Sequence, residues 1–92
     1  MYNTKDMKKL EKTIKAFGNI SRLKILQYLK KNKFASVVDI AKGTKCSYKA
    51  ISKHLSILYR VDVVDREQVG YAMHYKLSDT MDQVAISILR FL

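Results

Sequence analysis

The sequence predicts a mainly α-helical domain with one small β-hairpin, in the order α-α-α-α-β-β-α. Apolar residues recur at helical spacing through the first 60 residues and again after residue 79. Between these regions, residues 71–77 alternate apolar and polar side chains, as a strand does. The chain has 92 residues, no proline and no low-complexity tract, so we expect residues 1–92 to form a single domain.

The first two helices are predicted from an apolar stripe and from the break that follows it. The stripe of the first helix, at about residues 5–17, consists of Met7, Leu10, Ile14 and Phe17. Gly18 interrupts this pattern, and either Asn19 or Ser21 can cap a second helix. We expect that helix to close on the lysine-rich residues 30–33, because cations are favoured at the C-terminal end of a helix.

A helix-turn-helix is predicted over about residues 36–60. Ser36 has the side chain of an N-cap for a short helix, and Gly43 is expected to stop that helix. A tight turn then leads to a second N-cap at Ser47, or at Cys46, before a longer amphipathic helix. A short helix, a turn and a second amphipathic helix in this order are typical of a helix-turn-helix.

The longer helix of this pair, which we call the recognition helix, has two different faces. Ile51, Leu55 and Leu58 stack on one side. The opposite side has no acidic residue and consists of Lys49, Ser52, Lys53, Ser56 and Arg60. Cations meet phosphates, and serine or lysine can reach base edges without steric bulk. The sequence therefore predicts that this helix lies in the major groove of double-stranded DNA.

Further DNA contacts are expected at the start of the recognition helix and along it. Ser47 and Tyr48 lie where they can contact a base edge or a phosphate. Lys45 in the turn and Arg60 at the end of the helix are interpreted as phosphate contacts. His54 lies between the two faces, where it packs or contacts a phosphate. The alternative for all of these residues is a solvated helix face without a partner.

A wing is predicted after the recognition helix, over about residues 63–78. Gly70 is the natural turn residue of a hairpin, and Arg66, Gln68 and Tyr71 flank that turn. A wing commonly reaches the adjacent minor groove or its phosphates, so Arg66 is the preferred contact there. With this hairpin, the predicted fold is a winged helix-turn-helix.

One more helix is predicted at about residues 79–92, with Ser78 or Asp79 as its N-cap. Its apolar face includes Met81, Val84, Ile88 and Leu92. This face pairs naturally with the stripe of residues 5–17. A symmetric homodimer would also place two recognition helices one DNA turn apart. The alternative is that both stripes close the core of a monomer.

The distribution of charge favours a polyanionic partner. The net charge is +10, but residues 1–60 hold 15 cations and 3 acids whereas residues 61–92 hold 3 cations and 5 acids. The basic field therefore belongs to the part with the recognition helix, which favours double-stranded DNA over lysine-driven solubility alone. The chain has one cysteine and no apolar run long enough to cross a membrane, so we expect a cytoplasmic protein without a membrane partner.

Three segments of the chain carry motifs that occur together in one known family. Residues 17–26 are similar to "L-x-D-P-T-R-L-x-I-L", residues 47–58 to "S-x-x-x-V-S-x-H-L-x-x-L", and residues 66–77 to the wing pattern "R-x-x-G-x-x-x-x-Y-x-L". Over about residues 10–79 the chain thus resembles the ArsR-type family of bacterial and archaeal winged-helix repressors. The resemblance implies a dimer interface built from the first and last helices. Our hypothesis is a homodimeric repressor that binds an inverted repeat in duplex DNA.

The chain departs from that family at the turns and at the sites where other members sense metals. Ile20 stands where the family usually has proline, and Asp62 where glycine often ends the recognition helix. Some metal-responsive members have a C-x-C-D-L pattern in the third helix, and the matching residues 36–40 contain no thiol. Other members bind metal through Asp and His pairs on the last helix, which here offers Asp79 and Asp82 but no histidine. We therefore expect no metal site, no cofactor and no identifiable small-molecule effector.

Two alternative functions remain open at this point. Cys46 lies at a helix start between Lys45 and Lys49, where a thiolate is favoured, so a redox switch is conceivable although the chain has no resolving thiol. A winged helix can also serve as a protein-interaction module, which the basic first 60 residues argue against. No arrangement of residues indicates an enzyme, since we find no catalytic triad pattern, phosphate-binding glycine loop or paired carboxylates in a plausible site.

Overall fold

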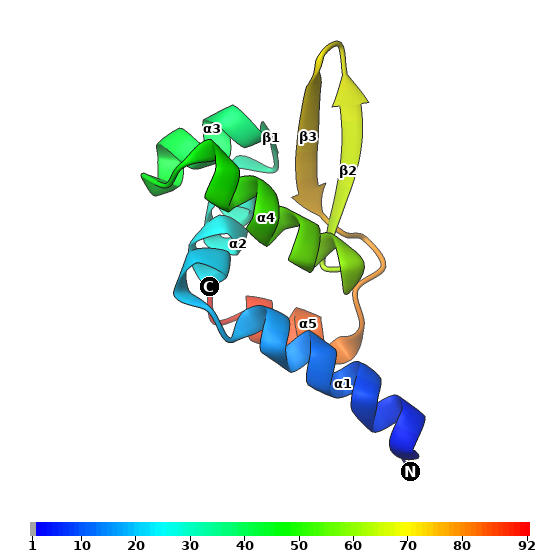
Figure 1. Cartoon of the computed structure of the whole chain (residues 1–92). Coiled ribbons are helices and arrows are strands. Elements are labelled where there is room, and N and C mark those ends of the chain that lie inside the picture. The colour runs from blue at the N-terminus through cyan, green and yellow to red at the C-terminus, as the bar shows by residue number, and fades with distance from the viewer. Residues whose placement is uncertain (1) are drawn as a thin grey trace.

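The computed structural model describes residues 2–92 of the chain. Within this range it contains five helices and a three-stranded antiparallel sheet. In chain order the elements are α1 (Thr4–Phe17), α2 (Ile20–Asn32), β1 (Phe34–Ser36), α3 (Val37–Thr44), α4 (Tyr48–Arg60), β2 (Val64–Val69), β3 (Ala72–Leu77) and α5 (Gln83–Leu89). Figure 1 shows the β2–β3 hairpin projecting at one end of the molecule and α1 with α5 at the other. This is the predicted winged helix-turn-helix, with one additional strand.

Side-chain caps fix the starts of the first four helices. Asn3 and Asp6 form a capping box that starts α1 slightly earlier than expected. Asn19, one of the two predicted candidates, caps α2 by accepting a hydrogen bond from the backbone N–H of Arg22 at 3.1 Å. The predicted caps of α3 and α4, Ser36 and Ser47, are also confirmed, each accepting a backbone hydrogen bond at 3.1 Å. Short polar side chains before apolar runs were therefore reliable guides to where these helices begin.

The prediction that Gly43 stops α3 is wrong. The helix continues through Gly43 to Thr44, and Lys45, whose φ of 57° is left-handed, is its C-cap. A Cβ atom at Gly43 would overlap the ring of Tyr28 on α2. Glycine is therefore required here by the close approach of α2 and α3, and a packing role of this kind has no local signal in the sequence.

The sheet has the strand order β1-β3-β2, with both pairs antiparallel. Gly70 occupies the hairpin turn with a φ of 64°, as predicted, and β3 begins one residue later than expected, at Ala72. The strand β1 was not predicted, because three residues are too few to show alternation. It forms by pairing with β3, so that Ala35 lies opposite Tyr75.

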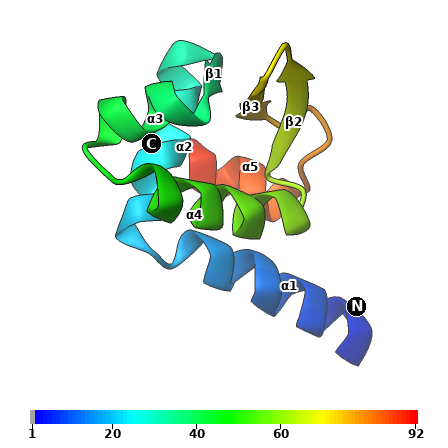
Figure 2. The same cartoon turned by 45° about the horizontal axis from the view of Figure 1, so that its top comes forward.

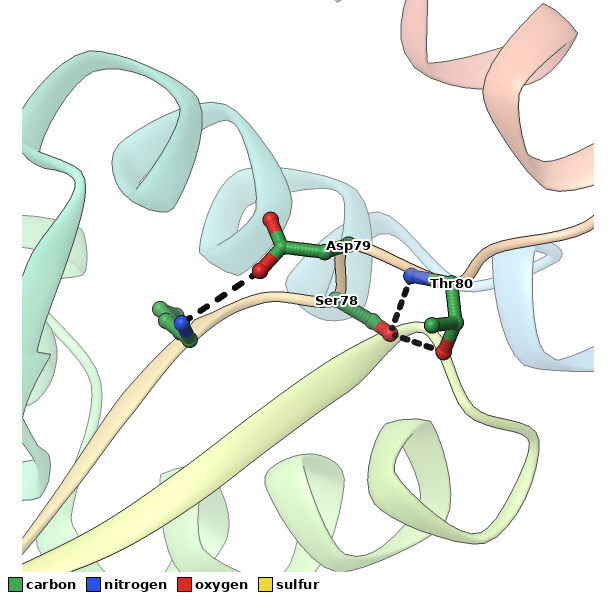
Figure 3. Close-up of polar contacts among 4 residues, drawn as sticks. Ser78, Asp79 and Thr80 are labelled. Atoms are coloured by element: carbon green, nitrogen blue, oxygen red, sulfur yellow. Dashed lines mark hydrogen bonds and ion pairs between the residues drawn. The ribbon is translucent and has the colours of Figure 1, made fainter.

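The last helix starts later than predicted, at Gln83 with Asp82 as its N-cap, so the assignment of this cap to Ser78 or Asp79 is wrong. The Ser78 hydroxyl instead accepts a hydrogen bond from the backbone N–H of Thr80 at 3.1 Å and shares a second one with the Thr80 hydroxyl (Figure 3). Asp79 forms an ion pair with Lys76 at 3.5 Å. These residues shape a turn between β3 and α5. The segment contains several side chains that can cap a helix, and the sequence alone does not say which one does.

The core lies between α2, α3, α4 and the base of the sheet. Leu26, Ile40 and Val64 have no exposed surface, and each such burial contributes about 1.5–3 kcal/mol. The chain leaves α4 through Asp62, whose φ of 60° lies in the left-handed region that favours glycine. The aspartate that replaces the usual glycine therefore forms a turn that glycine would also form, at some cost in backbone strain.

Candidate nucleic-acid interface

The rotation of α4 about its axis is fixed by its apolar side. Ile51, Leu55 and Leu58 have no exposed surface and contact the core. The predicted polar face is consequently turned outward. Its cations Lys49, Lys53 and Arg60 are exposed, and its serines Ser52 and Ser56 are half-buried. Figures 1 and 2 both show α4 on the front of the molecule with α2 behind it. The outward face of α4 is therefore basic and free of acidic side chains.

The N-terminal end of α4 is suited to phosphate groups. The first turn contains no acidic residue, so the partial positive charge of the helix terminus is not neutralised within the helix. Lys45, in the turn before α4, and Tyr48, in its first turn, are both exposed. The Ser47 hydroxyl oxygen caps the helix and retains its proton as a donor. Three of the predicted contact residues thus lie together at this end.

Arg22 connects α1 to the recognition helix. Its Nε donates to the carbonyl of Ala16 at 2.6 Å, and a terminal nitrogen donates to the carbonyl of Lys15 at 3.1 Å. Its other terminal nitrogen lies 3.2 Å from Nδ1 of His54 on α4. This arrangement requires His54 to accept the hydrogen bond as a neutral ring. Sequence spacing does not reveal the contact, because the two residues are 32 positions apart.

The environment of His54 favours its neutral form. Burial lowers the pKa of the imidazole below its usual value, and the positive charges of Arg22 and Lys53 lower it further. His54 is half-buried, with Nδ1 turned toward Arg22. His54 was predicted to pack or to contact a phosphate; the structure shows its contact with Arg22, and the phosphate contact stays a prediction.

The predicted contact residues of the wing lie at different positions along the hairpin, from its base to its turn. The Arg66 guanidinium lies 4.0 Å from the centre of the Tyr59 ring of α4, so it stacks at the base of the hairpin. Gln68 donates a hydrogen bond to the carbonyl of Gly70 at 3.3 Å. Tyr71 is fully exposed at the turn. The tip of the wing is therefore formed by Tyr71, whereas Arg66 is held against the recognition helix.

The stripe of α1 is only partly covered within one chain. Met7 is 58% exposed and Ile14 is 52% exposed, while Leu10 is half-buried. Phe17 lies in the core of the protomer, which leaves the other three as the accessible part of the stripe. The helix α5 packs against α1, and its Val84 and Ile88 are half-buried, as is Met81 before it. A pocket of about 380 Å³ joins the two sides, and exposed Tyr2, which the stripe pattern missed, lines it with Leu10 and Val84. Leu92, predicted for the same interface, is half-buried at another place, where it lines a groove with Lys24 and Tyr28 of α2.

Cys46 and His74, the other side chains that could react or bind a metal, each contact neighbouring residues of the fold. The Cys46 thiol donates to the carbonyl of Thr44 at 3.5 Å and packs against the core. His74 stacks on Phe34 with ring centres 4.9 Å apart. Among residues 2–92, no three His, Cys, Asp or Glu side chains gather closely enough to hold a metal ion. In the same range, no helix combines the length and apolar character needed to cross a membrane.

A comparison with known protein families identifies the family of the chain. Residues 20–66, which include α2, α3, α4 and the start of the wing, match the family described as "Bacterial regulatory protein, arsR family". A search of curated protein sequences found no relative of the chain.

Solved structures show the same fold. The chain is similar to HlyU from Vibrio cholerae N16961, with 26% identity, a TM-score of 0.79, and coverage of 97% of this chain and 92% of HlyU. It is similar to the homodimeric winged helix-turn-helix DNA-binding domain of Mb0332 from Mycobacterium bovis, with 21% identity, a TM-score of 0.79 and coverage of 92% and 75%. It is also similar to the transcriptional repressor PagR of Bacillus anthracis, with 22% identity, a TM-score of 0.77 and coverage of 97% and 98%.

Proposed function

Because the chain belongs to the bacterial arsR family of regulatory proteins, we propose that it is a homodimeric repressor that binds an inverted repeat in double-stranded DNA. Each protomer places α4 in a major groove and its wing against the flanking backbone or minor groove. Repression follows from occupying the operator, which needs no further surface for contacting RNA polymerase. The protein acts in the cytoplasm, where bacterial DNA is found.

The outward face of α4 is the observation that carries this proposal. Its apolar side is fully buried, so its lysines and Arg60 are exposed and its serines are half-buried on the opposite side. Lys49 and Lys53 are on the exposed side of a helix whose first turn is free of acidic residues. The excess of cations over acids in residues 1–60 extends the attraction for phosphates beyond α4 itself.

The dimer is supported by the exposed stripe of α1. Met7 and Ile14 are more than half exposed, which leaves an apolar surface uncovered next to the half-buried side chains of the C-terminal region. A second copy of the same surface covers it by twofold symmetry. The related domain of Mb0332 is described as homodimeric, which agrees with this arrangement.

Selection of bound duplexes from a random pool, followed by affinity measurement, tests the proposal. We expect an operator with two inverted half-sites. Replacing Lys49 and Lys53 with alanine should weaken binding by about tenfold or more and make the affinity less sensitive to salt. The double variant Lys8→Ala/Lys12→Ala, which removes the same charge from exposed positions on α1, is the matched control. Equal affinity of the α4 variant and the wild type would remove α4 from the interface.

The two alternative functions receive less support. Cys46 is the one cysteine of the chain, so no second thiol of the same chain can form a disulfide with it, and its half-buried thiol contacts the Thr44 carbonyl and the core. An unchanged oxidant response in Cys46→Ser would eliminate the redox switch. A protein-interaction module would bind its partner at high salt and fail to enrich any duplex at low salt.

A further inference from the structure

A basic groove lies beside the helix-turn-helix, outside the outward face of α4. It has a volume of about 910 Å³ and is formed by one face of α2, the last turn of α3 with Lys45 after it, and Leu92. Pockets that bind small molecules have volumes of about 300–1,000 Å³. The groove is therefore large enough for a small ligand. A rigid duplex is too wide to enter a concavity of this size.

The charged side chains that line the groove are all cationic. Lysines come from both of its walls, and none of the described residues that line it is acidic; these lysines are Lys24, Lys30, Lys31 and Lys45. The Lys30 ammonium already donates to the carbonyl of Leu89 at 3.0 Å, so Lys24, Lys31 and Lys45 are the cations offered to a ligand. Lys24 and Lys31 are seven positions apart on α2, so they share one face of that helix. Lys45 reaches the groove from the turn after α3. Ammonium groups on facing walls repel one another unless an anion lies between them.

The floor of the groove is preorganised by packing. Tyr28 lies between Lys24 and Lys31 on α2, and its ring rests on Gly43 so closely that no side chain fits there. The Thr44 hydroxyl is fixed by donating to the carbonyl of Ile40 at 2.7 Å. A site that already has its bound shape loses little conformational entropy when a ligand enters.

We propose that this groove binds small oligophosphate ligands and that such a ligand weakens DNA binding. Lysine ammonium groups are common phosphate ligands in proteins, and several of them here converge on one concavity. Lys45 belongs both to the groove and to the turn that leads into α4. A bound oligophosphate engages Lys45 and adds negative charge next to the phosphate-binding end of α4. The effect on DNA rests on the proposed function, whereas ligand binding itself does not.

Binding is tested with inorganic tripolyphosphate as the probe and backbone amide chemical shifts as the readout. We expect saturable shifts centred on the amides of Tyr28, Gly43 and Thr44. The variant Lys24→Gln/Lys31→Gln should weaken binding about tenfold, because it removes two charge-assisted contacts. The matched control Lys8→Gln/Lys12→Gln carries the same charge change on α1 and should retain the affinity. Shifts confined to α4 and the wing, or equal losses in both variants, overturn the proposal.

The link to DNA is tested by operator affinity with tripolyphosphate or with sodium chloride at equal ionic strength. We expect tripolyphosphate to weaken DNA binding more than chloride does in the wild type and in the α1 control. This excess should disappear in Lys24→Gln/Lys31→Gln, since binding linkage is reciprocal. If that variant loses DNA affinity but keeps its affinity for tripolyphosphate, the lysines contact DNA and the proposal is wrong. If no duplex binds while the groove still binds tripolyphosphate, the proposed function fails and the ligand site stands.

Discussion

The helices α1 and α4 have the same kind of amphipathic sequence, but their apolar faces differ in how far the fold buries them. They have 14 and 13 residues, and each carries an apolar stripe at helical spacing. The stripe of α4 has no exposed surface, whereas Met7 and Ile14 of α1 are more than half exposed. Periodicity therefore predicts which face of a helix is apolar, but it does not tell whether that face is covered by the same chain or by another.

This difference decides what each helix does. Because α4 is held in place by the core of its own chain, its polar face is fixed before any partner arrives. The stripe of α1 remains available, and an exposed apolar surface of this kind marks an interaction site. Under the proposed function, α4 presents its polar face to DNA, and α1 presents its exposed apolar stripe to a second protomer.

The largest expected effect is on the free energy of unfolding when the buried stripe is shortened. Leu55→Ala should lower that free energy by about 3 kcal/mol, because it leaves a cavity in the core. Ile14→Ala should cost less, and its cost should depend on protein concentration, since it weakens the dimer. Urea denaturation at two protein concentrations checks both. An Ile14→Ala cost as large as that of Leu55→Ala and independent of concentration would place the α1 stripe inside the monomer core.

The next effect concerns the exposed stripe. Charging it in the variant Met7→Glu/Ile14→Glu should convert the dimer to a monomer, as sedimentation would show. Operator affinity should then fall about 100-fold, or about 2.7 kcal/mol, because two half-sites are no longer bound by one particle. Lys8→Gln/Lys12→Gln, which also makes α1 more negative by two charges, is the control and should remain dimeric. A dimer that persists in the charged variant would locate the interface elsewhere.

A smaller effect is expected at the close approach of α2 to α3. Gly43→Ala forces a Cβ atom against the Tyr28 ring and should lower the free energy of unfolding by about 1–3 kcal/mol. Gly18→Ala is the matched control, since its nearest atoms beyond its chain neighbours are backbone oxygens at 3.6 Å, an ordinary contact distance. Thermal unfolding of both variants gives the comparison. Equal costs at the two glycines would mean that the α2–α3 approach is not tight.

Much of the fold could be predicted where the physical cause is local. The caps at Asn19, Ser36 and Ser47, the turn at Gly70 and the buried side of α4 all follow from residues within a few positions of one another. The errors arise where distant parts of the chain decide. The strand β1 exists because β3 pairs with it, and Gly43 is needed because of Tyr28 on another helix.

The candidate site divides in the same way. The outward face of α4 was predictable because one helix carries it. The Arg22–His54 contact joins residues that are 32 positions apart, and the basic groove combines α2 with the turn after α3. Neither can be predicted from a repeating pattern, because each depends on how α2 packs against its neighbours.

The smallest expected effect lies where Arg22 of α2 links the two compared helices, at His54. Its pKa is lowered in the folded protein, chiefly by burial and then by Arg22 and Lys53, whereas an unfolded chain has the usual value of 6.5. Below pH 6.5 the unfolded chain therefore binds more protons than the folded one. The stability that neutral His54 contributes is complete above that pH and is lost as the pH falls toward the lower folded pKa.

His54→Gln removes this titration and keeps a side-chain oxygen that can accept the Arg22 hydrogen bond. The difference in unfolding free energy between the wild type and this variant, measured from about pH 8 to about pH 5, should shift in favour of the variant as the pH falls. A difference that stays constant, or that shifts in favour of the wild type, would mean that protonation of His54 does not disturb the link between α1 and α4.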